Sequence, residues 1–457
     1  MLIVLILIEV TVLVAVIIIV VVVIVIVILI IKIIIVVVLV SVVVAVTVAV
    51  AALIILSRDA IAFMVITWIA GFCEGVKFWL YCSDVAGAFD RVDKDRLLAK
   101  LRAKGLHEKF VRILGSWLQA RQARVVVGGA AGDMLELVNM IYQGTVWGPW
   151  LWNVFFEDAC LAIRDALFSE IVYADDLNAF RAFSLQTANS QIYSETTRCQ
   201  KKLHAWGRAN RVAFDPGKES QHVISHHAPD GPNFKILAVL CDCRLTMAAA
   251  IHELVGECRW KLRALRRVGR FHSVLDPVDL YKSQVLSSIE YRTAGIYHAC
   301  DTLLAPLDAI QSSYLSDLGL DSKDALFGFN LAPLTTRRDI AMLGIIHRAV
   351  LGRGPPQFRK FIFPEAFPER HVQTRLSTRS HARRVHEYLD GCQLEIAKRS
   401  VLGLTSVYNM LPEQVVAADS VSLMQQRVQE VVRRSSGADG WEAVLSPRHP
   451  WYCHPLR

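Results

Sequence analysis

The stretch IVYADDLNAF, residues 171–180, places two adjacent carboxylates between two short apolar runs. Burying one charge in apolar surroundings is costly, and burying two neighbouring charges costs more, so Asp175 and Asp176 require an explanation. The two runs are short enough to pair as a β-hairpin, which would place both aspartates at its tip. Because neighbours in an extended chain point to opposite faces of a sheet, the two side chains are expected to differ in role.

A third carboxylate, Asp84, follows the apolar run VKFWLYCS at 76–83, which predicts a mostly buried strand. A hairpin tip beside the end of that strand would bring Asp175 to face Asp84 and leave Asp176 more peripheral. Three close carboxylates repel one another, and oxygen ligands without nitrogen suit Mg²⁺ or Mn²⁺. Two such ions hold the attacking and leaving oxygens of a phosphoryl transfer. An Asp-Asp pair taken alone is more simply a solvated turn.

Three blocks around these carboxylates resemble motifs A, B and C of reverse transcriptases, in the order and spacing of that family: YCSDVAGAFD (81–90), QGTVWGPWLWNVFF (143–156) and YADD (173–176). The resemblance is closest to the enzymes of non-LTR (LINE-like) retrotransposons. It continues through segments similar to motif D, motif E, the thumb and the C-terminal part of such elements: FDPGK (214–218), FKILAVLCDCRL (234–245), RTAGIYHA (292–299), LAPLTTRRDIAMLG (331–344) and YNMLP (408–412). YADD alone is a weak signal, whereas the ordered triple is a specific one.

The resemblance implies an α+β fold: a right-hand polymerase palm, in which helices back an antiparallel sheet, followed by a mainly helical thumb. It implies an RNA-directed DNA polymerase that uses two Mg²⁺ or Mn²⁺ ions to join dNTPs to a primer 3′-OH. The implied partners are an RNA template, a DNA primer and dNTPs, with no protein partner expected. The expected regions are an apolar low-complexity segment, a linker, the palm, the thumb and a basic C-terminal region: 1–56, 57–75, 76–247, 248–352 and 353–457.

The resemblance also implies roles for individual residues. Asp84 and Asp175 would bind the catalytic metals, and Asp176 would complete the acidic cluster. The main-chain carbonyl of Val85 would also reach a metal. Phe89 would pack under the incoming sugar and exclude a 2′-hydroxyl, although taken alone it is typical of an ordinary core residue.

Two further motifs imply contacts to the nucleotide. By this resemblance, Gln143 and Gly144 would contact the incoming nucleotide and the template base. Glycine permits close approach of the backbone to a ligand. The simpler interpretation is a turn before the helix that Pro149 opens. Lys218 would protonate pyrophosphate or contact the triphosphate, and its simpler interpretation is a solvated loop lysine.

The run RWKLRALRRVGR holds six basic residues and no acid: Arg259, Lys261, Arg263, Arg266, Arg267 and Arg270. On a helix, Leu262, Leu265 and Val268 would form the anchoring side. The basic residues predict salt-dependent, sequence-independent contacts to a primer–template backbone. The simpler interpretation is a solvated basic helix, but the formal net charge of +8 also favours a polyanionic partner.

Residues 1–56 are almost only Val, Ile, Leu and Ala, and residues 12–31 carry no polar side chain. This length predicts one or two transmembrane helices within 12–56, against the alternative of translated low-complexity sequence. A membrane location follows if the segment spans, and a nuclear or cytoplasmic one otherwise. Ten scattered cysteines without zinc-finger spacing indicate reduced thiols.

The chain also departs from the family. Residues 57–76 are too short for the fingers subdomain expected before motif A, and Ala238 stands where motif E usually has glycine. Weak or absent polymerase activity is therefore expected, because phosphoryl transfer depends on cations around the triphosphate. The alternatives are an inactive nucleic-acid-binding remnant of a retroelement, a membrane-anchored protein that carries a palm, and another palm-fold enzyme such as a nucleotide cyclase. The block QGTVWGP argues against the last of these.

Overall fold

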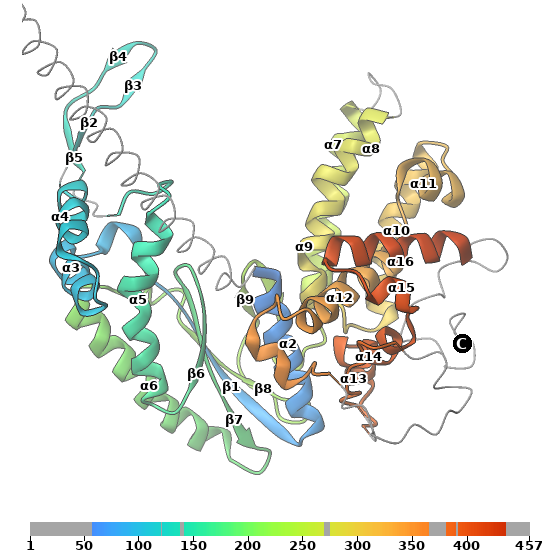
Figure 1. Cartoon of the computed structure of the whole chain (residues 1–457), viewed down its shortest axis with the longest axis horizontal. Helices are drawn as coiled ribbons and strands as arrows, with labels where there is room; N and C mark the ends of the chain where they lie inside the picture. Colours follow the sequence, from blue (N-terminus) through green and yellow to red (C-terminus); the bar gives the residue numbers. More distant parts are fainter. Residues whose placement is uncertain are drawn as a thin grey trace, which may run out of the picture. The chain divides into compact units, whose positions relative to one another are not determined.

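The predicted strand at 76–83 is β1 (Val76–Asp84), an inner strand of a four-stranded sheet (Figure 1). Its neighbours are β7 (Asp176–Ser184) and β8 (Ser220–Ile224), and β6 (Ser169–Tyr173) pairs with the outer side of β7. All three pairings are antiparallel, so the expected antiparallel sheet is present. The computed structural model describes residues 57–119, 121–137, 141–268, 275–364, 381–389 and 392–435.

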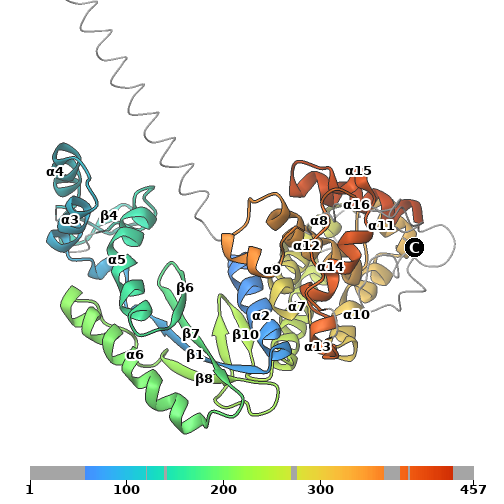
Figure 2. The ribbon, with the colours of Figure 1, turned by 60° about the horizontal axis from the view of Figure 1, so that its bottom comes forward.

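Alternate residues of β1 enter two different hydrophobic cores, as the period of a strand requires. Phe78 and Leu80 join a core that includes helix α2 (Ser57–Cys73) and much of the C-terminal region. Trp79 and Tyr81 join a second core, in which α5 (Gly148–Arg164) and α6 (Asn189–Asn210) pack together. Helices therefore back both faces of the sheet, with α5 and α6 on one side and α2 on the other (Figure 2).

The segment between motifs A and B folds as two helices followed by a small interrupted hairpin. The helices are α3 (Lys94–Ala103) and α4 (Glu108–Trp117), after a short 3₁₀ turn. The hairpin consists of two short nested ladders, and its glycine-rich middle closes a tight inner turn. The ladders join β2 to β5 and β3 to β4: Arg121–Ala123, Leu135–Leu137, Val126–Val127 and Ala130–Ala131.

Residues 57–75 were expected to be a linker, and this expectation is wrong. Residues Ser57–Cys73 form helix α2, which packs against β1 and against α9 (Ser287–Ile296). Its sequence is apolar on nearly every face, so its side chains are almost all buried. Asp59, in its first turn, accepts a hydrogen bond from Arg348 at 2.8 Å.

Beyond the sheet, the described chain is mainly helical, as expected. A two-stranded ladder, β9 (Phe234–Ile236) with β10 (Val239–Cys241), leads into α7 (Ala248–Val268). Phe214 forms a single β-bridge with Val85, next to the end of β1. The remaining helical segments follow in this order: α8 (Leu275–Tyr281), a π-helical turn (Lys282–Leu286), α9, α10 (Asp301–Asp317), α11 (Ser322–Phe329), α12 (Leu334–Val350), a 3₁₀ turn (Pro356–Lys360), α13 (Glu395–Lys398), α14 (Val401–Met410), α15 (Glu413–Val416) and α16 (Val421–Ser435).

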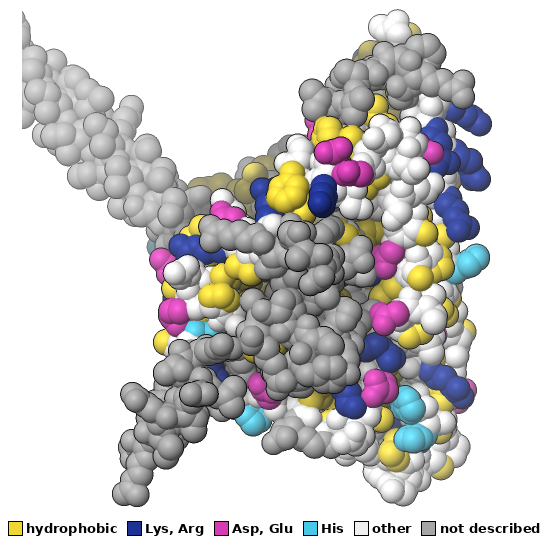
Figure 3. Space-filling model, turned by 90° about the vertical axis from the view of Figure 1, so that its right-hand side faces the viewer, with side chains coloured by type: hydrophobic (Ala, Val, Ile, Leu, Met, Phe, Trp, Pro, Cys, Tyr) yellow, Lys and Arg dark blue, Asp and Glu magenta, His cyan; other side chains and the backbone are white. Residues whose placement is uncertain are grey.

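Charged side chains are unevenly spread over the face shown in Figure 3. Lys and Arg side chains gather along one edge of that face, whereas acidic side chains are dispersed over it. The predicted membrane segment, residues 12–56, lies outside the described residues. Among the helices that the structure does describe, none combines the length and the apolar character needed to cross a membrane.

Candidate active site

The hairpin that carries YADD is formed by β6 and β7, but its tip differs from the prediction. Tyr173 pairs with Asp176, so the two residues of the turn are Ala174 and Asp175. Ala174 has a φ of +55°, a left-handed conformation that costs energy in a residue with a Cβ. The indole Nε1 of Trp152, on α5, donates a 2.6 Å hydrogen bond to the Ala174 carbonyl and holds this turn.

The register of the sheet brings Asp84 and Asp176 together. Asp176 is the partner of Asp84 in the last pair of the β1–β7 ladder, and directly opposed residues lie on the same face of a sheet. The expectation that Asp175 would face Asp84 and Asp176 would be peripheral is therefore corrected. The physical reason is the turn, which takes up Asp175 and leaves Asp176 as the first residue of β7.

Electrostatics at this pair follow from burial and crowding. Burial raises the pKa of Asp176 above its usual value, and the charges of Asp175 and Asp84 raise it further. The positive charge of Lys218 lowers the pKa of Asp176 and so acts against these effects. The Lys218 Nζ lies 2.5 Å from Asp84 Oδ2. The same contact raises the pKa of Lys218, so its ammonium is held protonated beside the carboxylates.

Backbone contacts next to Asp84 position Lys218. The Asp215 amide donates to the Asp84 carbonyl at 3.0 Å, which ties this loop to the end of β1. The Asp215 carboxylate then accepts from the Gly217 amide at 2.9 Å, and the Lys218 amide donates to the Asp215 carbonyl at 3.0 Å. Asp215 was not assigned a role from the sequence, although the turn-forming composition of FDPGK was a signal for it.

Phe89 and the motif B segment lie close to this hairpin. The Phe89 ring is tilted against Trp152 with centroids 5.8 Å apart, and a Cβ on Gly148 would meet its Cε1 at 3.5 Å. Gln143 and Gly144 are exposed in the turn before α5, and Gly144 has a φ of +80° that favours glycine. Val85 is buried, and its neighbour Ala86 donates to the carbonyl of Ala213.

The three carboxylates have the donor atoms that a divalent cation requires, although they do not converge on one point in this structure. Within the described ranges, no set of three or more His, Cys, Asp or Glu side chains closes on one point as a metal site. Asp84, Asp175 and Asp176 nevertheless supply only oxygen donors, which are the ligands that Mg²⁺ takes from proteins. With Lys218 as their charged neighbour, the group keeps an excess of negative charge. The donor set therefore fits Mg²⁺ or Mn²⁺.

Comparison with known proteins identifies the region that contains these residues. Residues 74–238 match a family model described as reverse transcriptase (RNA-dependent DNA polymerase). The middle of the chain is a reverse transcriptase domain. The domain holds the Asp84–Asp176 pair, the YADD hairpin and Lys218.

Curated relatives of the reverse transcriptase domain come from non-LTR retrotransposons. The RNA-directed DNA polymerase from mobile element jockey of Drosophila funebris is 24% identical over 260 residues, which cover 51% of this chain and 27% of the relative. Its Drosophila melanogaster counterpart is 25% identical over 236 residues, covering 44% and 25%. The Pol polyprotein from type-1 retrotransposable element R1 of Bradysia coprophila is 25% identical over 158 residues, covering 34% and 15%. The matches thus span about a quarter of each relative or less.

Among solved structures, telomerase from Candida albicans, in complex with a fragment of telomeric RNA, aligns with a TM-score of 0.30 and 10% sequence identity. The alignment covers 60% of this chain and 54% of that one.

The basic run expected at 259–270 lies on α7 as far as the structure describes it, and Arg270 lies outside the described residues. Leu262 and Leu265 are buried, as predicted for the anchoring side. Arg259, Arg263, Arg266 and Arg267 are exposed, and the first three line a groove of about 350 Å³ against α10.

The basic character of α7 is partly neutralised by acids from outside the run. Arg266 pairs with Asp317 of α10 and donates to Ser313. Lys261 pairs with Glu257 at 2.6 Å and donates to Ser288. Sequence reasoning missed Trp260, which is 64% exposed between these cations. An exposed tryptophan in a basic run was the available signal.

Proposed function

We propose that this reverse transcriptase domain is an RNA-directed DNA polymerase that adds dNTPs to a primer 3′-OH on an RNA template. The observation that carries the proposal is the pairing of Asp84 with Asp176 beside the Asp175 turn, within a domain of this family. Three carboxylates at one end of a sheet place negative charge where bound cations would hold phosphate oxygens.

The proposed mechanism assigns each side chain a task. Asp84, Asp175 and Asp176 would hold two Mg²⁺ or Mn²⁺ ions, which supply charge neutralisation at the attacking and leaving oxygens. Lys218 holds a proton at Nζ and would give it to the departing pyrophosphate. Phe89 would lie under the sugar of the dNTP.

The segment before α5 has a separate task in this proposal. Gln143 and Gly144, in the turn that precedes the helix, would contact the dNTP and the template base. Their exposure in that turn leaves both residues accessible to a ligand. The Trp152 hydrogen bond to Ala174 would keep this helix in register with the YADD hairpin.

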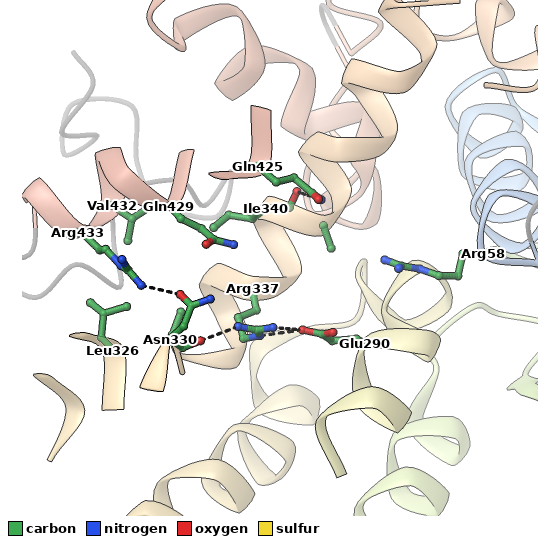
Figure 4. A pocket seen from close by; sticks show the side chains of 12 residues that line it. Arg58, Glu290, Leu326, Asn330, Arg337, Ile340, Gln425, Gln429, Val432 and Arg433 are labelled. Atoms are coloured by element: carbon green, nitrogen blue, oxygen red, sulfur yellow. Dashed lines mark hydrogen bonds and ion pairs between the residues drawn. The ribbon is translucent and has the colours of Figure 1, made fainter. Parts of the chain in front are cut away.

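We also propose that the activity of the chain alone is weak. Lys77, one of the two basic residues between residue 57 and motif A, is 2% exposed and donates to Asn189 at 2.9 Å. Burial lowers its pKa, and its ammonium is committed to that contact. The other, Arg58, lines a pocket among the C-terminal helices (Figure 4). In this proposal neither side chain binds the triphosphate. Cations at the triphosphate supply much of the transition-state stabilisation in phosphoryl transfer.

Primer extension on an RNA template tests both statements. We expect residues 57–457 to extend a DNA primer slowly with Mg²⁺, and Asp84→Asn or Asp175→Asn to lower the rate at least 100-fold. Robust extension would contradict the proposed weakness. Extension that survives both substitutions would contradict the assigned site.

A second candidate function is nucleic-acid binding without catalysis, and the exposed arginines of α7 favour it. It predicts binding of primer–template that weakens steeply with salt and is indifferent to Asp84→Asn. Binding of this kind in a protein that shows no extension under any metal condition would replace the polymerase proposal.

A further inference from the structure

The side chain of Lys218, the proposed proton donor, is 62% exposed. A lysine side chain is flexible, and packing cannot fix one that faces solvent, so the place of its Nζ depends on how firmly the main chain is held. Before Lys218, Asp215 holds the main chain, because its carbonyl accepts from the amides of Lys218 and Glu219 at 3.0 and 3.1 Å. After Lys218, the main chain is held by the side chain of Glu219.

The Glu219 carboxylate contacts a different element from Lys218, namely helix α6. Its Oε1 lies 2.7 Å from Nε2 of His204, and its Oε2 accepts from Nε2 of Gln200 at 2.8 Å. A carboxylate only accepts, so Nε2 of His204 carries the hydrogen. His204 and Gln200 are four positions apart and therefore lie on the same face of α6. Both oxygens of Glu219, whose side chain is only 12% exposed, thus have a partner on this helix.

Helix α6 is itself packed closely against the segment that leads to Lys218. The His204 ring stacks on the ring of Phe214, with centroids 5.5 Å apart and planes 18° apart. Phe214 bridges to Val85, the residue after Asp84. A Cβ on Gly207 would lie 2.8 Å from the carbonyl oxygen of Val212, so glycine is required for this approach. The helix is therefore a firm support for the Glu219 carboxylate.

We propose that Glu219, His204 and Gln200 are positioning residues for Lys218. They anchor the residue that follows Lys218 to α6 and so keep its Nζ at Asp84. This inference rests on the proposed function, in which Lys218 gives a proton to pyrophosphate. Proton transfer requires a donor within hydrogen-bond reach, so a looser main chain at 218 would slow the chemical step and leave primer–template binding unchanged.

Variants of the two α6 residues test the proposal in single-nucleotide addition. His204→Leu removes the donor and keeps a side chain of similar size, and we expect it to slow addition roughly tenfold, as for loss of a hydrogen bond to a charged group. Gln200→Met should act in the same direction. His204→Gln should restore most of the rate, because its amide nitrogen can donate in place of Nε2. Arg198→Leu, at an exposed position of α6, is the control and should change nothing.

A double variant shows whether His204 acts through Lys218. If it does, His204→Leu with Lys218→Gln adds nucleotides as slowly as Lys218→Gln alone, because the side chain that His204 positions is already gone. A further slowing of roughly tenfold, equal to the effect of His204→Leu by itself, would show that His204 acts elsewhere and would overturn the proposal. Thermal unfolding checks that each variant is folded.

A second measurement does not need polymerase activity. The Lys218 Nζ must leave Asp84 before an amine-reactive ester can label it, and mass spectrometry follows the labelling of each lysine. We expect His204→Leu and Gln200→Met to speed the labelling of Lys218 several-fold and to leave exposed Lys201 unchanged. If they do so but Lys218→Gln extends primers normally, the proposed role of Lys218 is wrong and the positioning stands. Unchanged labelling of Lys218 in both variants would overturn the positioning itself.

Discussion

The Nζ of Lys218 lies 2.5 Å from Oδ2 of Asp84, so a protein cation already contacts the carboxylate proposed to bind a metal. Removing that cation should change metal affinity and the rate of primer extension in opposite directions. We expect Lys218→Gln to bind Mn²⁺ more tightly, because a competing positive charge is lost, and to extend primers at least tenfold more slowly, because the proton donor is lost. Metal titration and single-nucleotide addition measure the two effects.

Lys201→Gln is the matched control for Lys218→Gln, because Lys201 is an exposed lysine on α6 away from the carboxylates. It should change neither measurement. If Lys218→Gln weakens Mn²⁺ binding, the ammonium does not compete with the metal, and the proposed role of Lys218 is wrong.

The raised pKa of Asp176 predicts a specific pH dependence of stability. A carboxyl whose pKa is higher in the folded state binds more protons there, so stability falls as pH rises from the unfolded value of 3.8 through the folded value. The penalty is complete at neutral pH. We expect Asp176→Asn to stabilise the metal-free protein at pH 7 by roughly 0.2–1 kcal/mol, the usual size of a cross-strand charge effect.

Denaturant unfolding at two pH values checks this expectation. The gain from Asp176→Asn should vanish at pH 3, where the carboxyl is protonated in both states. Addition of Mg²⁺ at pH 7 should stabilise the wild-type protein more than the variant. A variant that is less stable than wild type at pH 7 without metal would show that Asp176 is not crowded by Asp84 and Asp175.

Trp152 should matter through its indole N–H rather than through its size alone. Trp152→Phe loses the hydrogen bond that holds the left-handed Ala174, whereas Trp79→Phe removes a buried indole whose Nε1 has no partner among the described residues. Trp152→Phe should therefore destabilise by about 1 kcal/mol more than Trp79→Phe. It should also lower primer extension, because the YADD turn loses its support. If Trp152→Phe and Trp79→Phe lost equal stability and equal activity, this role of Trp152 would be wrong.

From the sequence, the strand that ends in Asp84 and the hairpin that carries YADD were predicted correctly. Which aspartate of the YADD hairpin lies opposite Asp84 was not. Motifs A and C placed Asp84 at a strand end and the doublet on a hairpin, because apolar patterning and turn composition are local signals. The register of the two strands is not local. It depends on which two residues take up the turn, and a shift of one residue exchanges Asp175 for Asp176 opposite Asp84.

Contacts between segments that are distant in the sequence could not be predicted from local sequence patterns either. Motif B contains three tryptophans, but nothing in the local sequence indicates that Trp152 donates a hydrogen bond to the turn of YADD. The same limit explains the linker error at 57–75. A uniformly apolar helix is recognised as core only when the elements that cover it, here β1 and α9, are known.

The arginines of α7 should set the salt dependence of nucleic-acid binding. Arg259 and Arg263 are exposed one helical turn apart on the same groove. We expect Arg259→Gln with Arg263→Gln to reduce the slope of log K against log salt by roughly 1 to 2, since each lost phosphate contact accounts for about 0.7–0.9. Fluorescence anisotropy with labelled primer–template measures the slope. The pair Arg198→Gln with Lys201→Gln removes the same charge from α6, and an equal effect there would mean that only net charge matters.

The ion pair between Asp59 and Arg348 tests whether α2 is part of the core. The Asp59 side chain is 6% exposed, and burial raises its pKa even though Arg348 lowers it. Arg348→Met would leave a buried carboxylate without a partner, at a cost of about 3–5 kcal/mol at pH 7. That cost should shrink as pH falls, because a protonated Asp59 carries no charge to bury. Adding Asp59→Asn should restore most of the lost stability at pH 7. If Arg348→Met unfolds at the wild-type denaturant concentration, α2 does not contribute to the core as described.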